Sequence, residues 1–239
     1  MVTVSLEMSG AEASRPYIEA AAPEHPSLLD PSHRMDALFG VVNIPNVVWI
    51  DEQGMVVRPA EPGWPESQGV RLRALSEAMP KVGRAPGAPP PPTAAADLRT
   101  QLASGQDRST YADAVRDWVT KGAASEHALS ADEVVARSQP RSMATSQAAA
   151  HFELAQQLWR TGRRDAALGH FRECHRLQPD NWTYKRQAWS AVSEERVGGD
   201  VGRFVQGPVE GEEDAWPFAS DFRSDVAVLA PGEYYPKTL

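Results

Sequence analysis

Apolar positions in the first quarter of the chain alternate between strand-like and helix-like spacing, which predicts an α/β region. The expected elements are a strand at 2–7, a helix at 11–22, a short strand at 25–29, a helix at 33–39 and a β-hairpin within 39–58. The triplet Asp30-Pro31-Ser32 is typical of a helix cap, and the hairpin turn lies at Asp51-Glu52-Gln53-Gly54. Because Pro16 lies inside the first helical stretch, that helix could instead begin near Pro16.

Proline and glycine then interrupt the pattern twice. Residues 59–65 form a turn-rich exit from the hairpin, and residues 67–79 return to helical spacing. Residues 83–92 read Gly-Arg-Ala-Pro-Gly-Ala-Pro-Pro-Pro-Pro, which predicts a semi-rigid spacer and a domain boundary.

Helical patterns dominate the chain after this spacer. They cover 94–103, 109–121, 131–137, a long stretch from about 142, and a further helix near 182–192. Within them, residues 150–181 resemble one tetratricopeptide (TPR) repeat, in which two helices interlock. The matching positions are Leu154, Ala155, Leu158, Gly162, Ala167, Phe171, Cys174 and Pro179. Residues 198–239 predict an irregular tail, anchored by Trp216, Phe218, Phe222, Tyr234 and Tyr235.

The most distinctive short motif, Gly40-Val-Val-Asn-Ile44-Pro45, precedes the hairpin. A proline entering a buried strand removes a backbone donor. A cis Ile44–Pro45 bond would explain it, with a trans proline as the alternative. With the preceding helix and the Asp-x-x-Gly-x-Val-Val of the hairpin, this motif resembles the second half of the thioredoxin superfamily, most closely redoxins of the TlpA/ResA type. The resemblance implies that the loop holds an extended substrate chain, with Ile44 and Pro45 as substrate-binding residues.

The two resemblances imply a fold class of α/β followed by all-α. A partial thioredoxin-like fold, β-α-β-α-β-β-α, is linked to a TPR-like helical region. The expected domains are an N-terminally incomplete thioredoxin-like domain at 1–82, a proline-rich linker at 83–93, a helical region at 94–197 and an irregular tail at 198–239. The family's Cys-x-x-Cys segment would lie ahead of Met1. Either the true start is upstream, which we favour, or the short form is genuine and its redox role is lost.

The chain has one cysteine, Cys174, so it cannot run an intramolecular disulfide cycle. No catalytic residue is therefore predicted, and no catalytic activity is expected for the chain as given. The repeat position of Cys174 favours a buried structural thiol, although Arg172 and Arg176 lie near it in sequence. His170 and Cys174 are four residues apart and could share a metal, but no third ligand is evident, so no metal or cofactor is predicted.

Composition narrows the classes of partner. A net charge of −8 over 239 residues argues against general nucleic-acid binding. No apolar run approaches the ~20 residues of a membrane span, and no signal peptide is visible. The chain as written is expected in the cytoplasm. Export or a membrane anchor, common among TlpA/ResA relatives, would follow if the true N-terminus lies upstream.

Two functions stay open at this point. In the first, the full gene product is a thiol–disulfide oxidoreductase whose Pro45 loop aligns the substrate. In the second, the chain is a non-catalytic interaction protein with a peptide-holding surface and a helical docking platform. Both imply a protein or peptide client. The side chains of Trp159, Trp182 and Trp189 could form an aromatic groove for it, with core packing as the alternative. The sequence does not set the oligomeric state.

Overall fold

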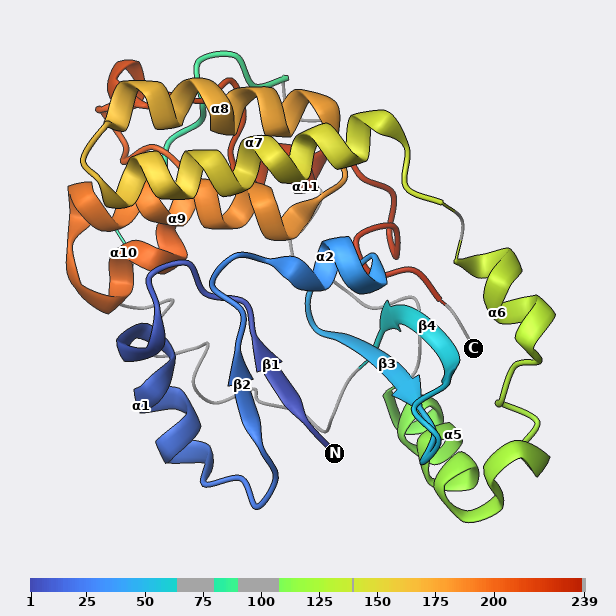
Figure 1. The fold of residues 1–239 in the computed structure, drawn as a ribbon. Coiled ribbons are helices and arrows are strands. Elements are labelled where there is room, and N and C mark those ends of the chain that lie inside the picture. The colour runs from blue at the N-terminus through green and yellow to red at the C-terminus, as the bar shows by residue number, and fades with distance from the viewer. Residues whose placement is uncertain (64–79, 90–107, 139, 238–239) are drawn as a thin grey trace. The chain divides into compact units, whose positions relative to one another are not determined.

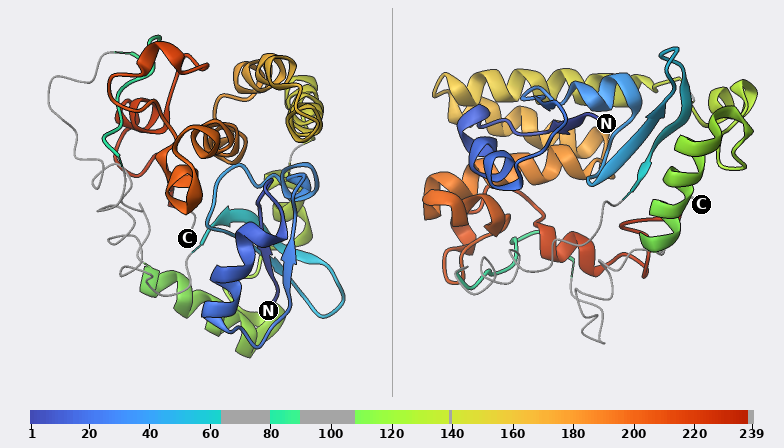
Figure 2. Two further views of the ribbon diagram at one scale, coloured as in Figure 1. Left: turned by 90° about the vertical axis from the view of Figure 1, so that its left-hand side faces the viewer. Right: turned by 90° about the horizontal axis from the view of Figure 1, so that it is seen from below.

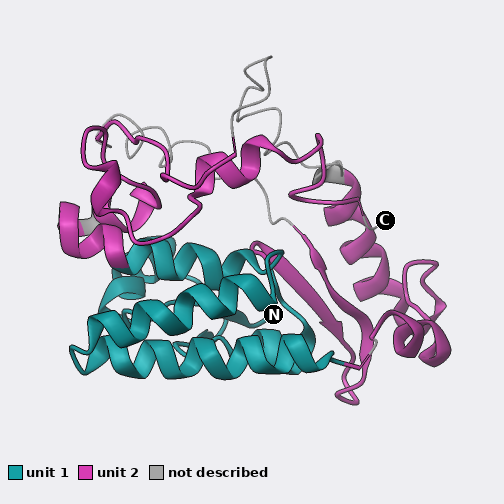
Figure 3. Cartoon of the chain, turned by 90° about the horizontal axis from the view of Figure 1, so that it is seen from above, with its two compact units in different colours: residues 1–42, 141–191 teal, residues 43–140, 192–239 magenta. Residues whose placement is uncertain are grey.

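The computed structural model describes residues 1–63, 80–89, 108–138 and 140–237 of the 239-residue chain. The chain forms two compact units, each assembled from two stretches of sequence (Figure 3). Unit 1 comprises Met1–Val42 and Arg141–Ala191, and unit 2 comprises Asn43–Pro140 and Val192–Leu239. Strands and helices mix in the first part of the chain and helices follow (Figure 1), which confirms the coarse fold class. The predicted domain boundaries stay a prediction.

Unit 1 begins with a β-α-β-α segment. Its elements are β1 (Thr3–Ser5), α1 (Ala11–Ala21), β2 (Ser27–Leu29) and α2 (Arg34–Phe39). The two strands are parallel, and α1 is the crossover that parallel pairing requires. The hydroxyl of Ser5 lies 2.8 Å from that of Ser14, which joins strand to helix. Because α1 begins at Ala11, Pro16 lies within the helix and does not start it.

Asp30 satisfies a backbone donor in the first turn of α2, as the predicted cap requires, although the N-cap position itself is taken by His33. The Oδ2 of Asp30 accepts a hydrogen bond from the backbone N–H of Met35 at 2.8 Å, which satisfies one of the donors left open at the start of a helix. Gly40 ends the helix at φ 75°, a left-handed conformation that glycine adopts without steric cost.

Three helices complete unit 1: α7 (Met143–Arg160), α8 (Arg164–Leu177) and α9 (Trp182–Val197), whose last turns belong to unit 2. Figure 2 (left) looks along α7 and α8, which pack side by side. The residues buried on these two helices are Ala148, Phe152, Ala155, Gln156, Leu158, Ala167, Phe171 and Cys174. The predicted helical hairpin is therefore present, although Leu154 is 44% exposed and does not follow the predicted register. Its membership of the TPR family stays a prediction.

The predicted hairpin opens unit 2, as β3 (Asn46–Ile50) and β4 (Val56–Pro62). At its turn, Asp51 Oδ1 accepts hydrogen bonds from two later backbone N–H groups, which is typical of an Asx turn. β4 continues to Pro62 through Pro59, so the expectation of a turn from residue 59 is wrong there. Among the described residues each sheet has only two strands, and a strand at the edge of a sheet tolerates a missing N–H.

Two helices follow in unit 2, α5 (Arg108–Lys121) and α6 (Ala131–Arg137). α5 packs Tyr111 and Ala114 against Trp49 of β3, and this contact is the hydrophobic core of the hairpin. Ser130 and Glu133 form a capping box at the start of α6, which satisfies two backbone donors reciprocally.

The C-terminal part of unit 2 is more regular than the sequence predicts. It contains α10 (Gly199–Val205), α11 (Phe222–Ala227) and the 3₁₀ turn η2 (Glu213–Ala215), while a similar turn, η1 (Gly122–Ala124), follows α5. Of the expected anchors, Trp216, Phe218 and Tyr234 are buried. Part of the proline-rich stretch packs here too, because the N–H of Ala85 donates to Asp221 at 2.8 Å.

The helices predicted at 67–79 and 94–103 lie outside the described residues. In the part of the chain that the structure describes, no helix is both long enough and apolar enough to cross a bilayer.

Candidate functional site

The loop Asn43–Pro45, which leads into β3, is the first candidate site. Its Ile44–Pro45 bond is cis, as the motif predicts. The side chain of Asn43 is almost fully buried, and its Oδ1 accepts a hydrogen bond from the N–H of Ile44 at 2.9 Å. The loop is thus braced by its own asparagine. The side-chain amide N–H of Asn43 and the carbonyl of Ile44 are directed to another segment of the chain.

That segment is the tyrosine pair, Tyr234 and Tyr235, near the C-terminus. Asn43 Nδ2 donates a hydrogen bond to the backbone carbonyl of Tyr234 at 2.8 Å, and the Tyr235 hydroxyl donates to the carbonyl of Ile44 at 3.0 Å. Tyr234 is 3% exposed, and its ring meets Phe222 edge to face at 5.9 Å. A segment near the C-terminus is therefore hydrogen-bonded to the loop.

Asn46, the first residue of β3, supplies an unsatisfied acceptor next to the loop. Its Oδ1 is buried and finds no hydrogen-bond donor among the residues that the structure describes. A buried acceptor without a donor costs about 1–3 kcal/mol.

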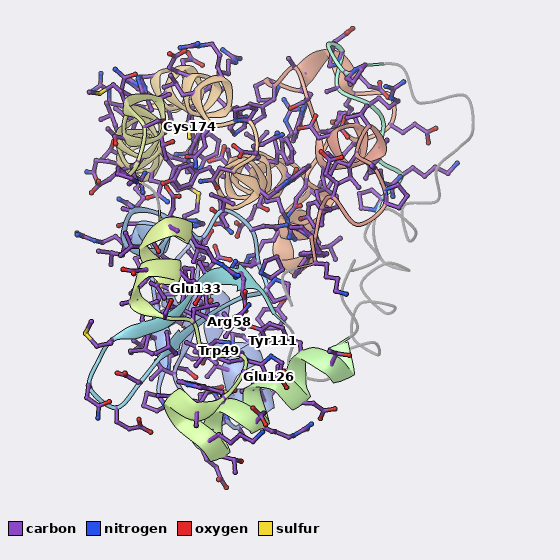
Figure 4. All side chains as sticks on the ribbon, turned by 90° about the vertical axis from the view of Figure 1, so that its right-hand side faces the viewer. Trp49, Arg58, Tyr111, Glu126, Glu133 and Cys174 are labelled. Carbon is purple, nitrogen blue, oxygen red and sulfur yellow. The ribbon has the colours of Figure 1, made fainter. Side chains whose placement is uncertain are left out.

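A buried ion pair between Arg58 and Glu61 of β4 supports the hairpin. Figure 4 labels Arg58 with its neighbours Trp49 and Tyr111. The guanidinium of Arg58 donates to both oxygens of Glu61, at 2.8 and 3.0 Å, and to the carbonyl of His127 at 2.8 Å. Tyr111 donates its hydroxyl to Glu61 and accepts the indole N–H of Trp49. Burial, and then the charge of Glu61, raise the pKa of Tyr111 well above its ordinary value. Glu61 accepts three hydrogen bonds, so the cluster braces the hairpin.

A second buried carboxylate, Asp36 on α2, lies in unit 1. Its Oδ2 accepts hydrogen bonds from the hydroxyl of Tyr184 at 2.7 Å and from Arg141 at 3.0 Å. Burial is the main cause that raises the pKa of the Tyr184 phenol. Sequence reasoning missed this cluster because its members lie 105 and 148 residues from Asp36, and no local spacing indicates such pairs. Both partners are engaged, so the cluster ties α2 to the helices.

His33, at the start of α2, is buried beside this cluster with φ 55°. Its ring meets Phe152 edge to face at 5.0 Å, and neither ring nitrogen has a hydrogen-bond partner among the described residues. Burial lowers the pKa of His33 to about 4, although the nearby charge of Asp30 opposes the shift. His33 is therefore neutral at physiological pH.

The single thiol is enclosed in the helical hairpin of unit 1 (Figure 4). Cys174 is 0% exposed, and burial, followed by the charge of Asp36, raises the pKa of its thiol far above the ordinary value. Only a thiolate attacks a disulfide. The structure thus confirms the expectation of a buried cysteine, and the basic residues near it in sequence do not lower its pKa.

The three tryptophans proposed as a groove differ in exposure. Trp182 and Trp189 on α9 are buried, and the ammonium of Lys185 lies over both rings, 4.6 and 5.4 Å from their centroids. Trp159 on α7 is half-buried beneath the guanidinium of Arg164, at 4.2 Å. Their burial fits core packing, and a role in binding a partner stays a prediction.

His170, considered above as a metal ligand with Cys174, pairs with another histidine. His151 Nδ1 and His170 Nδ1 are 2.8 Å apart, so one ring donates a hydrogen bond to the other. Within the described ranges, no group of three or more His, Cys, Asp or Glu side chains could hold a metal ion.

Comparison with protein-family models, with curated proteins and with solved structures gives no match to this chain.

Proposed function

We propose that this chain is a polypeptide-binding protein of thioredoxin-like architecture that holds a client segment at the loop Asn43–Pro45. It carries out no thiol–disulfide exchange through its own residues. One observation carries the proposal: the loop already holds polypeptide, through one side-chain amide and one backbone carbonyl.

The surroundings of the loop support this proposal. The bond from Asn43 to a backbone carbonyl contacts the main chain, which every client offers. The loop leads directly into β3, which pairs with β4 alone among the described strands. An open strand edge is a template for an added strand, and main-chain pairing of this kind is a common mode of peptide recognition.

The state of the thiol supports the non-catalytic half of the proposal. Exchange would require Cys174 to reach a substrate disulfide as a thiolate, and both its burial and its raised pKa oppose this. The element order β-α-β-α-β-β supports the thioredoxin-like architecture, although among the described residues β1–β2 and β3–β4 form separate two-stranded sheets.

The test uses the full chain and two assays. A fluorescently labelled, S-carboxymethylated unfolded polypeptide is the binding probe, followed by anisotropy, and insulin reduction with dithiothreitol is the redox assay. We expect saturable binding with a Kd between micromolar and millimolar, and no insulin reduction above the dithiothreitol blank. Cys174→Ala, which removes the thiol with little change of shape, is expected to match the wild type in both assays.

Two results would contradict the proposal. Insulin turnover that exceeds the blank and disappears in Cys174→Ala would show that the chain has its own thiol chemistry. Absence of binding up to millimolar polypeptide, by a chain with native circular dichroism, would remove the polypeptide-binding function.

A further inference from the structure

We infer that the client segment carries an aromatic residue followed by tyrosine, and that the tyrosine pair at the C-terminus of this chain competes with it for the loop. This inference rests on the proposed function and adds to it the class of ligand and an internal competitor. The tyrosine pair serves as the pattern for the ligand, because it is the polypeptide that the loop holds.

One contact of the tyrosine pair would form with any residue, and the other requires a particular side chain. The bond that Asn43 donates to the carbonyl of Tyr234 uses the main chain and selects no side chain. The bond that the Tyr235 hydroxyl donates to the carbonyl of Ile44 selects tyrosine over phenylalanine, because phenylalanine would leave that carbonyl without this donor. The second position of the motif is therefore tyrosine.

The first position requires an aromatic ring. Tyr234 is 3% exposed, and its ring packs edge to face against both Phe222, at 5.9 Å, and Tyr235, at 4.5 Å. Edge-to-face pairs of this kind are favourable beyond the area that they bury. A small or charged side chain would leave this space empty or place a charge in it.

The tyrosine pair competes with a client because it belongs to the same chain as the loop. A segment of the same chain binds the loop at an effective concentration set by the linking chain, so an external client meets a site that is already partly occupied. The apparent affinity of the client falls by the fraction of molecules in which the loop is closed. Weakening the tyrosine pair should therefore strengthen client binding, which is the opposite of the effect expected for an ordinary contact residue.

The experiment removes the hydroxyl of the second tyrosine once from the protein and once from the peptide. The probe is a labelled peptide Gly-Glu-Tyr-Tyr-Pro-Lys, which copies residues 232–237, and its partner probe has phenylalanine in place of the second tyrosine. The proteins are the full wild-type chain, Tyr235→Phe, and Tyr17→Phe, a control that makes the same chemical change on α1. Since one neutral hydrogen bond is lost, each change should alter affinity about 3- to 10-fold.

The change in the protein and the change in the peptide are expected to shift the peptide affinity in opposite directions. Tyr235→Phe should bind the Tyr-Tyr peptide about 3- to 10-fold more tightly than the wild type, and the phenylalanine probe should bind every protein about 3- to 10-fold more weakly. Tyr17→Phe should equal the wild type.

Three results overturn the inference, and they separate it from the proposed function. Equal peptide affinity of Tyr235→Phe and wild type means that the tyrosine pair does not compete. Equal affinity of the two probes means that the hydroxyl of the second tyrosine in the peptide does not contribute to binding. If neither peptide binds while the unfolded polypeptide does, the ligand class is wrong and the proposed function stands. If the unfolded polypeptide also fails to bind, the proposed function falls as well.

Discussion

Replacing Glu61 with alanine is expected to lower the free energy of unfolding by roughly 3–5 kcal/mol. The substitution removes the carboxylate to which the guanidinium of Arg58, which is 3% exposed, donates two hydrogen bonds, and it removes an acceptor of the Tyr111 hydroxyl. Removing one partner of a buried ion pair is strongly destabilising, and this term dominates the loss. Urea denaturation followed by tryptophan fluorescence measures it, since Trp49 lies in the same cluster.

Two further variants make the interpretation specific. Glu52→Ala removes a carboxylate from the exposed hairpin turn and should change stability by less than about 0.5 kcal/mol. The double variant Arg58→Met with Glu61→Leu removes both charges and should recover most of the stability lost in Glu61→Ala. A loss below about 1 kcal/mol in Glu61→Ala would mean that the ion pair is not enclosed as described.

Acidification is expected to remove roughly 3 kcal/mol of stability through His33 alone. The folded-state pKa of His33 is about 4, below the ordinary value of 6.5, so between these values the unfolded chain binds a proton that the folded chain does not. The contribution is complete above pH 6.5 and is lost progressively as the pH falls toward 4. The measurement is the free energy of unfolding by urea from pH 7.5 to 4.

His33→Asn is the matched comparison for this titration. Asparagine does not titrate and tolerates the left-handed backbone at φ 55°. His175, whose pKa burial lowers to about 3, is present in both proteins and cancels in the difference. Between pH 7.5 and 4, the free energy of unfolding of the wild type should fall by roughly 3 kcal/mol more than that of His33→Asn. Curves that stay parallel would show that His33 is not buried and neutral.

Elements defined by local spacing could be predicted from the sequence. β2, α2, the β3–β4 hairpin and the α7–α8 pair follow from periodic apolar residues and from caps such as Asp30. The burial of Cys174 follows from its position in the repeat-like spacing of residues 150–181. The course of β4 through Pro59 could not be predicted, because proline stops a strand only where its N–H is needed for pairing.

The candidate site was predicted in part. The motif before the hairpin indicated the loop at Ile44 and Pro45, but it carried no information on what occupies that loop. The hydrogen bond from Asn43 to Tyr234 spans 191 residues, as does the bond from Tyr235 to Ile44. Contacts over such separations leave no periodicity in either segment. The tail aromatics could be recognised as anchors, but the surface to which they are anchored could not.

Hydrogen–deuterium exchange of the full chain, with and without the S-carboxymethylated polypeptide, tests most directly whether the loop Asn43–Pro45 holds a client. We predict slower amide exchange in peptides that cover residues 41–50 and faster exchange in those that cover 231–237, because the client protects the loop and displaces the tyrosine pair. Unchanged exchange at 41–50 under saturating polypeptide, or protection confined to α7, α8 and α9, would contradict this prediction.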